Sequence, residues 1–217
     1  PQNVMLTAAG IVKIMDFGLA RGAEDHTVMT EAGAMLGTVP YMSPEQSQGQ
    51  RAGKASDIFS LGVVCYEMLG GRRPFLGESP SAITDAILHD VPRPVSGLNP
   101  LVPSSLVAAI QSMLEKDAAR RCQNVADVRR VLDQLVVELE VFNDRALLAE
   151  YAQDPQQAAQ RLAATGLARH LARGAALEKE GPAAVERAVR EYECVLYLDP
   201  KNGDAKSALA RLAKAKP

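Results

Sequence analysis

Apolar residues near the start of the chain form two short runs that a turn-like segment separates. The runs are Val4–Leu6 and Ile11–Ile14, and the small and polar residues 7–10 lie between them. Two strand-like runs joined by such a segment favour an antiparallel β-hairpin. Because a hairpin brings its two ends together, we expect Asn3 and Asp16, which flank it, to be neighbours.

The apolar spacing becomes helical after residue 55. Residues that follow Ser56 and Asp57 are apolar on nearly every face of a helix, until Gly70-Gly71 and Pro74 end the pattern. Such a helix is predicted to lie in the centre of a domain, with Ser56 or Asp57 capping its N-terminus. Its apolar positions are Ile58, Phe59, Leu61, Val63, Val64, Cys65, Met68 and Leu69.

A second helix is predicted from about Val125 to Leu139, after which the composition changes. Its apolar stripe consists of Val128, Val131, Leu132, Leu135 and Val136. Nine of the thirteen prolines occur by Pro103, whereas nineteen alanines lie between Glu140 and the end. A loop-rich half therefore precedes a helix-rich half. We place the boundary near residues 140–155, where Asp154-Pro155 interrupts the helical pattern.

Charge and cysteine content exclude several classes of function. The net charge is −2 with both signs interspersed, which indicates neither a nucleic-acid nor a membrane-surface partner. No apolar run approaches the ~18 residues of a membrane span, and no signal peptide is visible. Cys65, Cys122 and Cys194 form no CxxC motif, so buried thiols in a reducing cytosol are expected. The expected location is the cytoplasm, with any membrane anchor lying outside these residues.

Two motifs in the first 45 residues carry a family resemblance. Asp16-Phe17-Gly18 is followed about twenty residues later by Gly37-Thr38-Val39-Pro40-Tyr41-Met42-Ser43-Pro44-Glu45. At this spacing the pair resembles the activation segment of a bacterial eukaryotic-type (Hanks-type) serine/threonine protein kinase. Pro1-Gln2-Asn3 is similar to the end of the kinase catalytic loop, HRDLKPxN. The resemblance implies that the catalytic Asp and Lys lie immediately before residue 1 and that the chain begins in the kinase C-lobe.

A nucleotide and metal site follows from the same resemblance. Asn3 and Asp16 offer a carboxamide oxygen and a carboxylate, which are hard oxygen ligands that suit Mg²⁺. In kinases the corresponding Asn and DFG Asp hold the metal ions that bridge the ATP phosphates. The resemblance therefore implies an ATP and Mg²⁺ site that includes Asn3, Asp16, Phe17 and Gly18, with Asn3 and Asp16 as the metal ligands.

Residues 19–42 are polar and show no sustained period, which is typical of a mobile loop. The resemblance implies that Thr38 positions the Ser or Thr hydroxyl of a protein substrate. Thr30 begins a segment similar to the TxTG of bacterial kinases, whose threonines are autophosphorylated, although Ala32 replaces the second threonine. Thr30 is therefore the predicted regulatory phosphosite, since a phosphate there can pair with Arg side chains. A solvated loop threonine and phosphorylation of Thr27 are the alternatives.

Three further residues have structural roles implied by the resemblance. Asp57 lies in a helix similar to the central kinase helix, where it would accept backbone N–H bonds from the catalytic loop; a simple helix cap is the alternative. Glu45 and Arg121 are similar to the Glu and Arg that form a buried ion pair in kinases. Without the resemblance, Arg121 would be assigned to a solvated helix surface.

The C-terminal part resembles a tetratricopeptide repeat (TPR). Ala188, Tyr192 and Leu198–Asn202 are similar to the second helix and exit turn of such a repeat. A first helix is predicted around Leu167–Glu180, with Gly181-Pro182 as the turn, and a generic amphipathic helical hairpin is the alternative. Two short helices cannot fully bury their apolar face, so we expect this face to bind a protein partner or dock on the kinase lobe. The face comprises Leu167, Leu171, Leu177, Val185, Tyr192 and Leu196.

The combined prediction is a mainly α fold in three parts. Residues 1–139 form a kinase-like C-lobe with a small β-hairpin, residues 140–165 a helical linker, and residues 166–217 a TPR-like α-hairpin. The predicted activity is phosphoryl transfer from ATP, with Mg²⁺, to Ser or Thr hydroxyls of protein substrates. These 217 residues alone are expected to be inactive, because they contain neither the Gly-rich loop nor the catalytic Asp. The rival prediction is a non-catalytic pseudokinase scaffold that binds partner proteins; the retained DFG and GT motifs argue against it.

Overall fold

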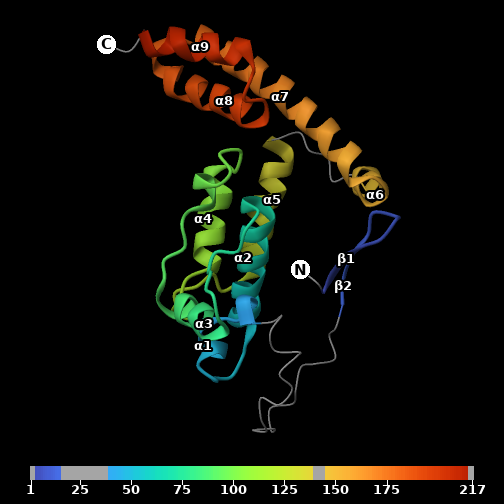
Figure 1. Cartoon of the computed structure of the whole chain (residues 1–217), viewed down its shortest axis with the longest axis vertical. Coiled ribbons are helices and arrows are strands. Elements are labelled where there is room, and N and C mark those ends of the chain that lie inside the picture. Colours follow the sequence, from blue (N-terminus) through green and yellow to red (C-terminus); the bar gives the residue numbers. More distant parts are fainter. Residues whose placement is uncertain (1–2, 16–38, 139–144, 215–217) are drawn as a thin grey trace. The chain divides into compact units, whose positions relative to one another are not determined.

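The structure is a computed structural model of the chain, and it describes residues 3–15, 39–138 and 145–214. These residues form two compact units (Figure 1). The first unit contains residues 39–138, and the second contains residues 3–15 together with residues 145–214. The mainly helical structure with one small antiparallel sheet confirms the predicted fold class.

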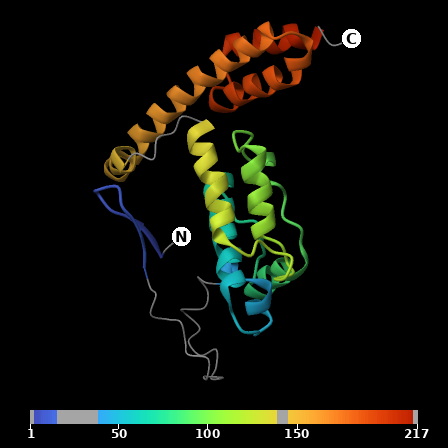
Figure 2. The ribbon, with the colours of Figure 1, turned by 180° about the vertical axis from the view of Figure 1, so that it is seen from behind.

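The first unit is a set of helices around one long central helix, α2. Its elements are η2 (Val39–Tyr41), α1 (Pro44–Ser47), α2 (Lys54–Gly70), α3 (Pro80–His89), η3 (Val95–Gly97), α4 (Ser104–Met113) and α5 (Val125–Glu138). Helix α4 contacts both α2 and α5 (Figure 2). The predicted helix near residue 125 is therefore confirmed, although Leu132 of its apolar stripe is exposed.

One face of α2 forms the core of the first unit. Phe59 and Phe75 stack with their ring centroids 5.9 Å apart. Gly62 allows close approach to α4, because a Cβ at this position would lie 2.9 Å from the Cβ of Met113. A larger residue would therefore overpack the core. The buried apolar residues of this cluster are Phe59, Val63, Tyr66, Phe75, Ala86, Ile87, Val95, Val102, Ile110 and Leu114.

Two predictions about α2 were wrong in detail. The helix begins at Lys54 with Gly53 at the N-cap, and Ser56 lies in the first turn, where its Oγ accepts the Gly53 N–H at 3.0 Å. Burial is also one-sided, because Leu61 and Met68 are 39% and 77% exposed. An all-round apolar sequence cannot show which side of a helix its neighbours cover.

The β-hairpin of the second unit confirms the prediction from the first apolar runs. Strands β1 (Val4–Leu6) and β2 (Val12–Ile14) pair antiparallel, with Val4 opposite Ile14. Gly10, at φ 71°, closes the turn and packs on helix α6 (Arg145–Gln153); a Cβ there would lie 2.2 Å from the Arg145 carbonyl oxygen. The predicted first domain grouped the hairpin with residues up to 139, whereas in the structure it packs with α6.

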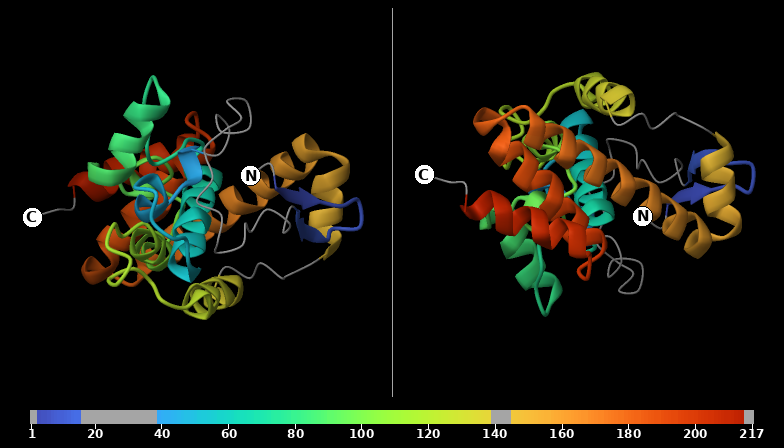
Figure 3. Two further views of the ribbon diagram at one scale, coloured as in Figure 1. Left: turned by 90° about the horizontal axis from the view of Figure 1, so that it is seen from below. Right: turned by 90° about the horizontal axis from the view of Figure 1, so that it is seen from above.

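The rest of the second unit is a bundle of three helices. These are α7 (Pro155–Lys179), α8 (Val185–Leu198), which follows the short helix η4 (Pro182–Ala184), and α9 (Gly203–Lys214). Figure 3 shows the three helices side by side. Asp154 caps α7 by accepting the N–H groups of Gln156 and Gln157, which explains why the helical pattern is interrupted at residues 154–155. The predicted turn at Gly181-Pro182 and the end of α8 at Leu198 are confirmed.

The two-helix prediction for this region was incomplete. Helix α7 begins at Pro155 rather than near Leu167, and α9 adds a third helix. Ala205, Ala208 and Leu212 of α9 are buried against the residues that were predicted to need an external surface. The cluster covered in this way includes Leu167, Leu171, Leu177, Val185, Ala188, Tyr192, Val195 and Leu196. Much of the expected apolar face is therefore covered within the unit. Among the described helices, none combines the length and apolarity needed to cross a membrane.

Candidate functional site

Most residues of the predicted nucleotide site lie outside the described part of the chain. These are Asp16, Phe17 and Gly18. Thr38, the predicted substrate-positioning residue, and Thr30, the predicted phosphosite, also lie outside the described residues. Asn3 is described: it is exposed at the start of the hairpin, and its carbonyl oxygen accepts the Met15 N–H at 2.7 Å. The two ends of the hairpin therefore meet, as the sequence predicted, and the exposed amide of Asn3 fits a hard cation. The contact between Asn3 and Asp16 stays a prediction.

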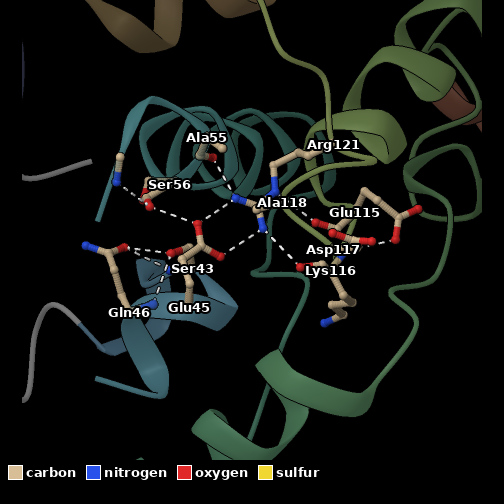
Figure 4. Close-up of polar contacts among 12 residues, drawn as sticks. Ser43, Glu45, Gln46, Ala55, Ser56, Glu115, Lys116, Asp117, Ala118 and Arg121 are labelled. Carbon is tan, nitrogen blue, oxygen red and sulfur yellow. Dashed lines mark hydrogen bonds and ion pairs between the residues drawn. The ribbon is translucent and has the colours of Figure 1, made fainter. Parts of the chain in front are cut away.

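The structure brings Glu45 and Arg121 together in the first unit, although 76 residues separate them (Figure 4). The side chain of Arg121 is wholly buried, and each of its five N–H groups has an acceptor. Nη1 donates to Glu45 Oε1 at 2.8 Å and to the Ala55 carbonyl at 2.7 Å, while Nη2 donates to Glu45 Oε2 at 3.0 Å and to the Lys116 carbonyl at 3.1 Å. Nε donates to the Glu115 carbonyl at 2.9 Å. One side chain thus joins α1, the start of α2 and the loop after α4.

The carboxylate of Glu45 is held by α2 as well as by Arg121. Ser56 Oγ donates to Glu45 Oε1 at 2.8 Å and accepts the Gly53 N–H, so the first turn of α2 is bonded to the acid (Figure 4). Burial alone would raise the pKa of Glu45, but the hydrogen bonds from Arg121, from its own backbone and from Ser56 lower this pKa to about 2. Glu45 is therefore ionised at neutral pH, and the pair is a charge-assisted bidentate contact.

Local sequence explains how Glu45 is presented. Ser43 is the N-cap of α1, and its hydroxyl oxygen accepts the Gln46 N–H. Oε1 of Gln46, at the third helical position, accepts the Ser43 N–H, which completes a capping box. Pro44 occupies the first turn, where its missing N–H costs nothing. The S-x-x-Q pattern of residues 43–46 was readable in the sequence, although the sequence analysis did not use it.

Asp57 takes a different position from its neighbour Ser56. It lies in the first turn of α2 and is exposed among the described residues. An acid in this position interacts favourably with the positive end of the helix dipole. Its predicted role as an acceptor of catalytic-loop N–H groups stays a prediction.

Tyr41 fixes the segment that follows Thr38 to α2. Its hydroxyl donates to Glu67 Oε2 at 2.7 Å, and its carbonyl oxygen accepts the Ser60 hydroxyl at 2.7 Å. Burial, with the hydrogen bond to Glu67, raises the pKa of Tyr41 to about 12. Tyr41 belongs to the GTxxY motif, but the sequence analysis assigned it no role because its partners lie in the middle of a distant helix.

Lys116 was also missed by the sequence analysis. Its Nζ lies 3.8 Å from the centroid of the Phe75 ring and donates to the carbonyls of Ala86 and Ile87, near the end of α3. Burial lowers the pKa of Lys116 to about 8. A lysine between Glu115 and Asp117 in sequence gives no local signal for such a buried position.

Comparison with known proteins agrees with this geometry. The protein kinase domain family matches residues 1–134. The serine/threonine-protein kinase PknB of Mycobacterium leprae is 39% identical over 129 residues, which are 59% of this chain and 21% of that protein. The protein named serine/threonine-protein kinases PknA of Corynebacterium glutamicum is 44% identical over 125 residues, 56% of this chain and 25% of that protein. The chain therefore belongs to the protein kinase family, and the relatives that it resembles are bacterial serine/threonine-protein kinases.

The matched regions also limit what the comparison covers. The chain spans about a fifth to a quarter of the length of these relatives. The family match ends at residue 134, so α7, α8 and α9 lie beyond it.

Proposed function

We propose that residues 1–139 belong to an enzyme that transfers a phosphoryl group from ATP, with Mg²⁺, to Ser or Thr hydroxyls of protein substrates. The observation that carries this proposal is the ion pair of Glu45 and Arg121. Two of the five donors of a buried guanidinium bind Glu45 of the SPE motif, directly after the GTxxY motif, and the other three bind backbone carbonyls of α2 and of the loop after α4. A fixed loop is what phosphoryl transfer requires, because most of its catalysis comes from positioning and charge stabilisation.

The proposed roles of the other residues follow the family pattern. Asn3 and Asp16 would hold Mg²⁺, with Phe17 and Gly18 completing the DFG segment at the nucleotide. The bound metal and nucleotide supply a polarised phosphoryl group for transfer. Thr38 would position the substrate hydroxyl, and Tyr41, three residues later, holds this part of the chain on α2 through Glu67.

We propose that the 217 residues alone are inactive. The Gly-rich loop, the strand Lys and the catalytic Asp of the kinase pattern do not occur in this sequence. Phosphoryl transfer needs these groups as well as the metal ligands. Activity is therefore assigned to the full-length parent protein.

For residues 166–217 we propose a TPR-like region that contacts a protein partner. Two features support it: α7 and α8 pack closely, with Gly174 against the Tyr192 ring, and α9 packs on α8 as a following repeat would. A groove of about 450 Å³ is lined by α7, α8 and α9, with Leu171, Tyr192 and Arg211 among its residues.

A substitution of the DFG acid tests the proposed chemistry. In the full-length parent, Asp16→Ala should abolish phosphoryl transfer to a Ser or Thr peptide, measured with labelled ATP, because one metal ligand is removed. Asp133→Ala is the matched control, since Asp133 is an exposed acid on α5 whose side chain is 65% accessible. It should retain full turnover. Activity of Asp16→Ala equal to the wild type would refute the assignment.

A further inference from the structure

Three segments meet at the C-terminal end of α2 in the first unit. The helix ends at Gly70, and Gly71 adopts φ 70° and leads into Arg72 and Arg73. The segment around η3 packs on the same end, because the Tyr66 hydroxyl donates to the Arg93 carbonyl at 2.8 Å. Asn99 Nδ2 donates to the Leu69 carbonyl at 3.0 Å. Residues 71–73 and 93–99 are therefore neighbours.

The third segment is η2, which ends at Tyr41. Tyr41 bonds to Glu67, the residue next to Tyr66, at 2.7 Å. Chain connectivity keeps Tyr41 close to Thr38, because three residues reach at most about 11 Å. The end of α2 is thus beside the segment that we propose to position the substrate hydroxyl.

Three arginines gather around this end of α2: Arg72, Arg73 and Arg93, which we call the arginine cluster. Arg73 acts electrostatically on Tyr41, while Arg72 and Arg93 act on Tyr66. Within the described residues none of the three forms an ion pair. Glu67, the nearby acid, is bonded to the Tyr41 hydroxyl. With the carboxylate of Glu67 counted against the three arginines, positive charge is still in excess at this end of α2.

One member of the cluster lies against the backbone of η3. A Cβ added at Gly97 would lie 2.6 Å from Nε of Arg93 and 3.1 Å from its Nη2, so the guanidinium lies directly on the η3 backbone. Arg73 is half-buried, and Arg72 and Arg93 are exposed. A positioned guanidinium loses less conformational entropy when it binds a ligand. A glycine at residue 97 is what leaves room for this arrangement.

We propose that the arginine cluster binds acidic side chains of the protein substrate, either carboxylates or phosphates, within a few residues of the phosphorylated Ser or Thr. This inference rests on the proposed function, because it places the substrate beside Thr38. Guanidinium groups match carboxylate and phosphate oxygens in a bidentate geometry. The cluster thereby selects acidic substrate sequences over neutral ones.

The expected size of this selection follows from exposed charge pairs. One such pair contributes between about 1.4-fold and 5-fold in affinity. Three such pairs multiply to between about 3-fold and 100-fold, so at low salt we expect a preference of roughly ten-fold for an acidic peptide. Screening should reduce the preference to a few-fold at high ionic strength.

A binding experiment on the 217-residue chain tests the inference without catalysis. Three labelled peptides share one Ser acceptor and carry Glu, phosphoserine or Gln at the flanking positions, and their affinities are measured by fluorescence anisotropy. The Glu and phosphoserine peptides should bind roughly ten-fold more tightly than the Gln peptide. The variant with Arg72→Gln, Arg73→Gln and Arg93→Gln should lose this difference.

Two controls keep the result specific. Arg51→Gln removes an exposed arginine from the opposite end of α2, about 25 Å away along its 17 residues, and should keep the preference. Arg72→Glu changes only an exposed residue, so it tests the idea even where the triple variant is unstable. Arg72→Glu should weaken binding of the Glu peptide and strengthen binding of a peptide with flanking Lys residues. An unchanged preference in Arg72→Glu, or an equal loss in Arg51→Gln, would overturn the proposal.

Turnover in the full-length parent separates this inference from the proposed function. The triple variant should raise KM for the Glu peptide about ten-fold and leave kcat unchanged. The KM for the Gln peptide should also stay unchanged. An inactive parent whose chain still prefers acidic peptides would refute only the kinase assignment. Two outcomes would refute only the acidic-substrate inference. One is an active parent without that preference, and the other is a chain that binds an oligonucleotide of equal charge as tightly as it binds the acidic peptide.

Discussion

Removing the guanidinium of Arg121 should destabilise the first unit strongly. The Arg121→Met variant keeps an unbranched side chain in the site but deletes all five donors, and it leaves the Glu45 carboxylate without its cation. The acid is only 13% exposed, so water replaces the lost partner poorly. The variant also leaves the carbonyls of Ala55, Glu115 and Lys116 without this donor.

The expected cost can be worked from these contacts. Breaking a buried ion pair by removing one partner costs about 3–5 kcal/mol. An unsatisfied buried carbonyl costs about 1 kcal/mol more, less where neighbouring groups relax. Glu45→Gln should cost less, because the amide oxygen can still accept from Arg121 and Ser56. In the double variant both charges are gone, so its cost should fall short of the sum by about 2 kcal/mol.

Amide hydrogen exchange on the 217-residue chain measures this cost unit by unit. In Arg121→Met, the opening free energies of the amides in α1 and α2 should fall by the amounts given above. Those of α8, which lies in the other unit, should not change and serve as the internal reference. Additive effects of the two single substitutions, or a loss below about 1 kcal/mol in Arg121→Met, would contradict the reasoning.

The same pair predicts a pH dependence. Glu45 has a pKa of about 2 in the folded chain against an ordinary value of 4.5, so the unfolded chain binds the proton first as the pH falls. Its contribution, on the order of 3 kcal/mol, is fully present above about pH 4.5 and is lost as the pH approaches 2. Unfolding of Glu45→Gln measured over this range should show a shallower loss of stability than the wild type.

Three further predictions concern packing, titration and regulation. Gly174→Ala should destabilise the second unit by about 1–3 kcal/mol in urea unfolding, since its Cβ would lie 2.8 Å from the Tyr192 ring. Gly166→Ala in the same helix meets only a 3.5 Å contact and should stabilise the unit by about 0.5–1 kcal/mol. Lys116 has a pKa of about 8 when folded and 10.5 ordinarily, so unfolding free energy measured from pH 8 to 9.5 should rise more in the wild type than in Lys116→Met; equal slopes would contradict this. In the active full-length parent, peptide mass spectrometry should find phosphate on Thr30, and Thr30→Ala should lower turnover; unmodified Thr30 in a fully active enzyme would exclude the role.

Local patterns in the sequence predicted the parts that depend on neighbouring residues. Two apolar runs on either side of a short turn predicted the hairpin, and Asp154-Pro155 predicted the interruption that the structure shows between α6 and α7, because strand pairing across a short turn and helix capping act over a few residues. The family motifs implied that Glu45 and Arg121 pair, which no local period contains. The structure places them 2.8 Å apart.

Tertiary structure alone decided which faces and charges are buried. The apolar sequence of α2 could not show that Leu61 and Met68 are exposed, and the alanines of α9 gave no sign that this helix covers the α7 and α8 pair. Lys116 and Tyr41 likewise gained their roles from partners in distant segments. The physical reason is that periodicity reports one element at a time, whereas burial and hydrogen bonding depend on residues that meet only when separate elements pack together.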